Sequence, residues 1–175
     1  MPPVQIALWT ILGVALLISV VTDVLGGRIF DVVTYPAMVG ALMVRWVVEG
    51  LGDSERGLVS GVIGLVGAMA LFGVLAWRGK MGWGDVKLMG AVGAAFGFPL
   101  VLAAVVFISL AGSVQAALTL LVQGHLRETL AASGRRWAQR LGLVPRGDSP
   151  GARRHIPYGV AIAFGCAWAM WWEAA

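Results

Sequence analysis

Three aspartates stand at the ends of apolar runs, where an ionisable side chain can do proton-transfer chemistry. Asp23 follows the uncharged run 1–22, and Asp31 and Asp85 each come just before another apolar stretch. An ionised side chain costs about 2.5–3.5 kcal/mol at the centre of a membrane helix and less at its end. Their position therefore indicates either a functional acid pair or a role in helix capping and topology.

The capping alternative differs between the three residues. Asp31 and Asp85 begin expected helices, where a carboxylate accepts hydrogen bonds from unpaired backbone N–H groups. Asp23 ends a helix, where the helix dipole disfavours an anion, although Arg28 could neutralise it. The residues alone leave both interpretations open.

Two glycines come immediately before the third of these acids, in the segment Gly82-Trp83-Gly84-Asp85. Glycine allows close backbone approach, so an extended substrate could lie here with the carboxylate facing its scissile bond. The alternative is a glycine-rich turn leading into a helix. Lys87 could approach Asp85 from a strand or loop, whereas on a helix it would point away, toward lipid head groups.

The composition places these residues in a membrane protein. Of 175 residues, 59% are hydrophobic and 13% are charged, and the mean hydropathy is +0.85. Soluble domains are about 45–50% apolar and about 25% charged. This excludes a disordered chain, a disulfide scaffold and an ordinary soluble enzyme. In so apolar a chain, the net charge of +4 indicates membrane orientation rather than nucleic-acid binding.

Charged residues and one Gly-x-Pro step divide the sequence into six apolar segments. These are 5–22, 32–48, 57–77, 84–98, 99–122 and 156–172. We therefore expect an all-α polytopic membrane protein, with about six transmembrane helices in a single domain, 1–175. The fourth segment is short, which suggests tilt or local thinning of the bilayer.

Basic residues gather on alternate connections between these segments, whereas the connection 49–56 carries Glu49, Asp53 and Glu55 with the single basic residue Arg56. The basic residues on the alternate connections are Arg28, then Arg78 and Lys80, then Arg127, Arg135, Arg136, Arg140, Arg146, Arg153 and Arg154. The positive-inside rule then predicts that both termini are non-cytoplasmic and that the three aspartates face the cytoplasm. The basic loop 123–156 is expected to carry an amphipathic helix on the membrane surface, with a solvated loop as the alternative.

A metal site is not expected. The two histidines, His125 and His155, lie thirty residues apart in the basic loop without carboxylates at ligand spacing, and Cys166 is the single cysteine. The eight tryptophans lie mostly near segment ends and indicate interfacial anchors rather than a cofactor site.

Three motifs follow one another through most of the chain. They are TDVLGGRI at 22–29, GWGDVKL at 82–88 and RHIPYGVA at 154–161. Together they resemble the motifs of the type IV prepilin peptidases, which are GxGD intramembrane aspartic peptidases of prokaryotic membranes. One departure lies at Ile29-Phe30-Asp31, where the family usually has Ile-Pro-Asn.

The resemblance implies an aspartic endopeptidase whose catalytic residues are Asp23 and Asp85. Such a pair shares one proton, so that one carboxylate activates water while the other polarises the scissile carbonyl. The residues expected to bind substrate or to shape the site are Gly82, Gly84, Lys87 and Asp31. No cofactor is implied.

The substrate implied by the resemblance is a prepilin, whose short basic leader is cut just before its hydrophobic helix. The expected partners are therefore the leader with its helix and the membrane lipids, without nucleic acid, at the cytoplasmic (inner) membrane. The chain starts at its first span and lacks Cys-x-x-Cys pairs, so it resembles the short form associated with Flp-type pili. N-methyltransferase activity is therefore not expected.

A small proton- or ion-coupled transporter is the alternative from another functional class, because intramembrane carboxylates also serve proton relays. Such a transporter is expected to carry binding groups near the membrane midplane and often inverted repeats. In this sequence the acids gather at one face and no such repeat is found.

Overall fold

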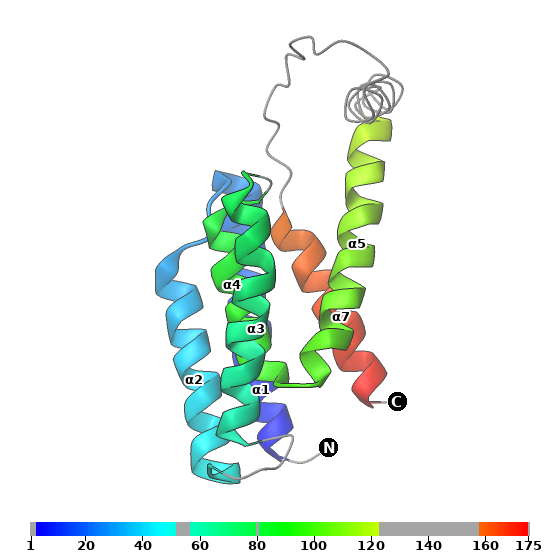
Figure 1. The fold of residues 1–175 in the computed structure, drawn as a ribbon. Coiled ribbons are helices and arrows are strands. Elements are labelled where there is room, and N and C mark those ends of the chain that lie inside the picture. The colour runs from blue at the N-terminus through cyan, green and yellow to red at the C-terminus, as the bar shows by residue number, and fades with distance from the viewer. Residues whose placement is uncertain (1–2, 52–56, 80, 123–157, 175) are drawn as a thin grey trace, which may run out of the picture. The chain divides into compact units, whose positions relative to one another are not determined.

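The computed structural model describes residues 3–51, 57–79, 81–122 and 158–174, and within them it contains helices and no strands. The helices are α1 (Pro3–Gly26), α2 (Asp31–Glu49), α3 (Leu58–Trp77), α4 (Trp83–Phe96), α5 (Leu100–Val122) and α7 (Tyr158–Ala174) (Figure 1). This confirms the all-α prediction. The amphipathic helix expected within 123–156 lies outside the described residues.

The helix bounds follow the apolar segments closely, with one useful difference. α1 continues through Gly26, so Asp23 lies inside its last turn rather than beyond its end. Four helical stretches are long and apolar enough to cross a membrane, namely α1, α2, α3 and residues 100–119 of α5. A crossing by α4 and α7 stays a prediction.

Contacts divide the chain into two compact units. The first contains the described residues up to Gly112 together with α7, and the second begins at Ser113, in the last turns of α5. All three aspartates belong to the first unit, which is the unit described below.

α4 is the central helix of this unit. It packs against α1, α2, α3 and α7, and every residue from Leu88 to Gly97 is buried. A helix that is apolar on all sides is expected to be enclosed by protein or lipid. Here the neighbouring helices enclose it, which explains how a helix of only 14 residues is accommodated.

Glycines allow α3 and α4 to pack with their backbones in contact. A Cβ atom on Gly64 would overlap the carbonyl oxygen of Gly93, and a Cβ atom on Gly93 would overlap that of Gly64. Small residues permit this kind of close approach between membrane helices. Gly67, in the same helix, has no atom within 4 Å of such a Cβ and takes no part.

A buried arginine closes the C-terminal end of α4. The guanidinium of Arg45, from α2, donates hydrogen bonds to the carbonyl oxygens of Ala94 at 2.8 Å and Ala95 at 2.7 Å. Carbonyls in the last turn of a helix have no intrahelical partner and carry partial negative charge, so a cation stabilises them. The sequence showed Arg45 only as a charge inside an apolar segment.

The first and last described helices meet at one end of the unit. The Gln5 amide, near the start of α1, donates to the Glu173 carboxylate, near the end of α7. The end of α1 and the starts of α2, α4 and α7 lie at the opposite end (Figure 1). The structure therefore places the chain's described ends at the end of the unit opposite to the three aspartates.

We expect Gly64→Ala to destabilise the protein and Gly67→Ala to leave it unharmed. The added methyl at position 64 must push the α4 backbone away, which typically costs about 1–3 kcal/mol. The same methyl at position 67 meets open space and gains up to about 0.5–1 kcal/mol of helix propensity. Thermal unfolding in detergent, followed by circular dichroism, measures both; equal unfolding temperatures would contradict the packing described above.

Candidate active site

Asp23 is a buried carboxylate that caps a helix other than its own. Only 4% of the residue's surface is exposed. Its Oδ2 accepts a hydrogen bond of 2.8 Å from the backbone N–H of Gly159. Gly159 is the second residue of α7, where N–H groups have no intrahelical partner. The positive end of α7 therefore favours the anion that the C-terminal end of α1 disfavours.

From the sequence, Asp23 was expected only to face the unfavourable C-terminal end of its own helix, with Arg28 as the group that could neutralise it. The contact observed is instead with the start of another helix. The partner is a backbone group 136 positions away, in a helix that begins beyond the long basic loop.

Gly159 must lack a side chain for this contact to form. A Cβ atom there would lie 2.8 Å from Oδ2 and 3.2 Å from Cβ of Asp23. Gly159 belongs to the third motif, RHIPYGVA, and no role was expected for it from the sequence. One sequence signal could have indicated this role. Gly159 lies at the expected start of a helix, and Asp23 is an acid for which its own helix offers no capping partner.

Asp85 is also buried, with 8% of the residue exposed, and it lies in the first turn of α4. Its Oδ2 accepts a hydrogen bond of 3.2 Å from the backbone N–H of Gly82. A carboxylate at the third helical position that reaches back to the N-cap N–H is one half of a capping box. The capping contact, one of the two alternatives that the sequence left open for Asp85, is therefore present in the structure.

Gly84 brings the start of α4 against the segment between α1 and α2. A Cβ atom on Gly84 would lie 3.0 Å from Cβ and 3.4 Å from the carbonyl oxygen of Ile29. Ile29 stands between Asp23 and Asp31 in the chain, so this approach draws the first turn of α4 toward both acids. The close approach that Gly84 allows is thus made within the protein itself.

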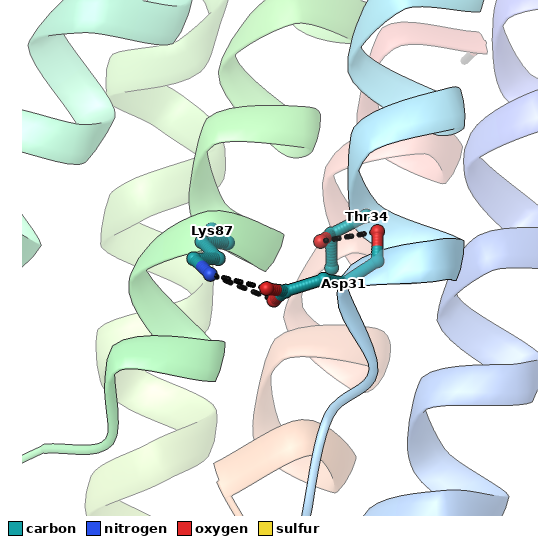
Figure 2. A network of polar contacts seen from close by, with 3 residues as sticks. All are labelled: Asp31, Thr34 and Lys87. Atoms are coloured by element: carbon teal, nitrogen blue, oxygen red, sulfur yellow. Dashed lines mark hydrogen bonds and ion pairs between the residues drawn. The ribbon is translucent and has the colours of Figure 1, made fainter.

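Lys87 faces α2 and not Asp85. Its Nζ lies 2.7 Å from each carboxylate oxygen of Asp31, as Figure 2 shows, and 5.2 Å from the centre of the Tyr35 ring. The side chains of Lys87 and Asp31 are 25% and 55% exposed. Lys87 could have stood on a strand or loop or on a helix, and the structure places it on helix α4. There its ammonium binds the carboxylate of Asp31.

The structure therefore sorts the acids into two kinds. Asp23 and Asp85 are buried, lie on the contacting helices α1 and α4, and each accepts a backbone N–H from a helix start. Asp31 is exposed and paired with Lys87. Two buried carboxylates held by backbone N–H groups form an arrangement suited to general acid–base chemistry.

A pocket at the other end of the unit is a weaker candidate for the active site. It is lined by Gln5, Arg45, Glu49 and Glu173 among apolar residues. It contains no residue of the three motifs, and its arginine already donates to the last carbonyls of α4.

Comparison with known families finds one family model that matches this chain. The model of the type IV leader peptidase family matches residues 10–117, which is more than half of the chain and includes Asp23, Asp31 and Asp85. The chain belongs to the type IV leader peptidase family. This confirms the resemblance inferred from the motifs and indicates a peptidase of the aspartic type. No curated protein and no solved structure gives a significant match.

The third motif lies beyond the part of the chain that matches this family of leader peptidases. The hydrogen bond from Gly159 to Asp23 nevertheless links it directly to the first motif. A physical contact thus connects a segment outside the match to a buried acid within it.

If Asp23 is catalytic, Gly159→Ala should lower the rate of leader-peptide cleavage by about a hundredfold, because displacing a catalytic group by about 1 Å has an effect of that size. The added methyl must displace the Asp23 carboxylate, which would lie 2.8 Å away. Gly13→Ala is the matched control, since its Cβ on α1 would meet nothing within 4 Å. Cleavage by Gly159→Ala at the wild-type rate would show that this bond does not position Asp23.

Proposed function

We propose that this chain is an aspartic endopeptidase that removes the basic leader of a prepilin, with Asp23 and Asp85 as its catalytic pair. The observation that carries the proposal is the burial of both carboxylates on contacting helices, each bound by a helix-start N–H. Membership of the leader peptidase family supports the same reaction class.

The reaction needs one proton shared between the two carboxyl groups, because two neighbouring carboxylates do not ionise together readily. The ionised group takes a proton from water as the water oxygen attacks the scissile carbonyl carbon. The protonated group gives its proton to the carbonyl oxygen. When the tetrahedral intermediate collapses, one of its hydroxyl groups returns a proton to the pair, the C–N bond breaks and the leaving amine takes up a proton from the pair, which is left again with a single proton.

The backbone N–H groups contribute by orientation. A carboxylate bound through Oδ2 keeps one rotamer, so less reorganisation is needed when water and peptide arrive. Gly82 and Gly159 supply these donors from two different helices, and Gly84 holds the first of these helices close to the 28–30 segment.

The proposed setting is the cytoplasmic (inner) membrane of a prokaryote, with six crossings and both termini on the non-cytoplasmic side. The contact between Gln5 and Glu173 at one end, and the acids at the other, support this topology. The substrate would then be cut at the cytoplasmic face, with its hydrophobic helix in the lipid beside the enzyme. We propose a Flp-type prepilin as substrate, a role in pilus biogenesis and no N-methyltransferase activity.

The transporter alternative has less support from the described residues. Their buried acidic side chains are Asp23 and Asp85, and both stand at the same end of the unit. A coupled transporter is expected to place its ion-binding groups near the midplane.

The test is cleavage of a prepilin co-expressed in membranes with the wild type or with Asp23→Asn, Asp85→Asn or Asp31→Asn. Asparagine keeps the shape of the side chain and removes the acid. We expect the first two variants to lose at least about a hundredfold in rate, because general acid–base catalysis is lost. Asp31→Asn should still cleave at saturating substrate. Mass spectrometry of the pilin measures leader removal.

The double variant Asp23→Asn/Asp85→Asn is the decisive control. Continued cleavage by this variant would refute the peptidase assignment to these residues. Loss of cleavage in Asp31→Asn and Asp85→Asn, with cleavage retained in Asp23→Asn, would make Asp31 the first catalytic carboxylate instead.

A further inference from the structure

α2 presents a small site for an ammonium group at the active-site end of the unit. Asp31 and Tyr35 stand four positions apart and therefore lie on the same face of the helix. The ammonium of Lys87 lies 2.7 Å from both carboxylate oxygens and 5.2 Å from the ring centre. Figure 2 shows the lysine reaching this carboxylate from α4. A carboxylate combined with an aromatic ring is a favourable environment for a cation.

The site is accessible from outside. Asp31 is 55% exposed in its side chain, and Tyr35 is 49% exposed. Exposed ion pairs contribute little to stability, so replacing the Lys87 ammonium by another cation costs little. A carboxylate also has more acceptor positions than a single ammonium fills.

The site lies at the same end of the unit as Asp85, because Asp31 begins α2 and Asp85 lies in the first turn of α4. Lys87 follows Asp85 by two residues, and Asp31 follows Ile29, the residue against which Gly84 packs. A peptide that presents a bond to Asp85 would pass close to the starts of α2 and α4. A basic side chain near that bond would then come within reach of Asp31 and Tyr35.

We propose that Asp31 and Tyr35 form a subsite for a basic side chain of the peptide substrate, and that Lys87 occupies this subsite until the substrate displaces it. Lys87 is then an internal competitor of the substrate. The inference rests on the proposed peptidase function, and it assigns the residue at which the sequence departs from the family pattern to substrate selection.

A simple brace between α2 and α4 makes a different prediction. If the ion pair served only to hold the two helices together, removing either charge would disturb the site in the same way. If Lys87 competes with the substrate, removing the lysine strengthens substrate binding, whereas removing the acid weakens it. The two variants therefore change the affinity in opposite directions.

The experiment measures binding of a fluorescent peptide, with lysines before an apolar segment, to the Asp85→Asn protein in detergent. Adding Lys87→Gln should tighten binding roughly two- to fivefold, and adding Asp31→Asn should weaken it by a similar factor. Tyr35→Leu should also weaken it, by roughly twofold or more. The matched peptide with glutamines in place of lysines should bind all variants equally.

Weaker binding in both Lys87→Gln and Asp31→Asn, or no change in either, would overturn the proposal. If Lys87→Gln lowers the unfolding temperature, Lys87→Met replaces it, because this variant also removes the charge. Asp31→Lys should in turn prefer a leader with glutamates. Because binding is measured without cleavage, its result is separate from the cleavage test of Asp23 and Asp85.

Discussion

The hydrogen bond between the Gly159 N–H and the Asp23 carboxylate is the contact on which the site depends. It joins the last turn of α1 to the first turn of α7 across 136 positions of sequence. A carboxylate enclosed by apolar helices is costly unless hydrogen bonds compensate for its lost hydration. Here the start of a second helix supplies both the donor and a favourable dipole, and the missing side chain of Gly159 supplies the space.

Charged side chains bind the backbone groups at both ends of α4. Asp85 in its first turn accepts the N–H of Gly82, and the guanidinium of Arg45 donates to Ala94 and Ala95 in its last turn. An acid at the positive end and a cation at the negative end both complement the helix dipole. This explains how a short helix can be buried among its neighbours with charged groups at its two ends.

The sequence predicted those features that depend on local pattern. Apolar runs between charges, together with the Gly-x-Pro step at 97–99, predicted the six described helices, although Asp23, Arg45 and Asp85 lie inside them. The place of Asp85 at a helix start suggested capping as one of two alternatives, and the capping contact is local because its donor lies three residues away. The partner of Asp23 could not be predicted, since a backbone N–H has no residue type to recognise. Helical periodicity gave only a conditional expectation, that Lys87 on a helix would point away from Asp85, and it did not show that Asp31, 56 positions earlier, would receive the lysine.

Asp31, where the sequence departs from the family pattern, adds a third acid at the same end of the unit as Asp23 and Asp85, but its charge is paired and exposed to water. A third unpaired carboxylate close by would disfavour ionisation of the pair through like-charge repulsion. Asp31 instead lies 55% exposed, where water screens it, and its charge is balanced by an ammonium 2.7 Å away. An asparagine at this position, as the family usually has, could accept a hydrogen bond from Lys87 but would leave the positive charge unbalanced. Exposure and pairing therefore separate the acids into a buried pair suited to proton transfer and an outer acid suited to binding a cation.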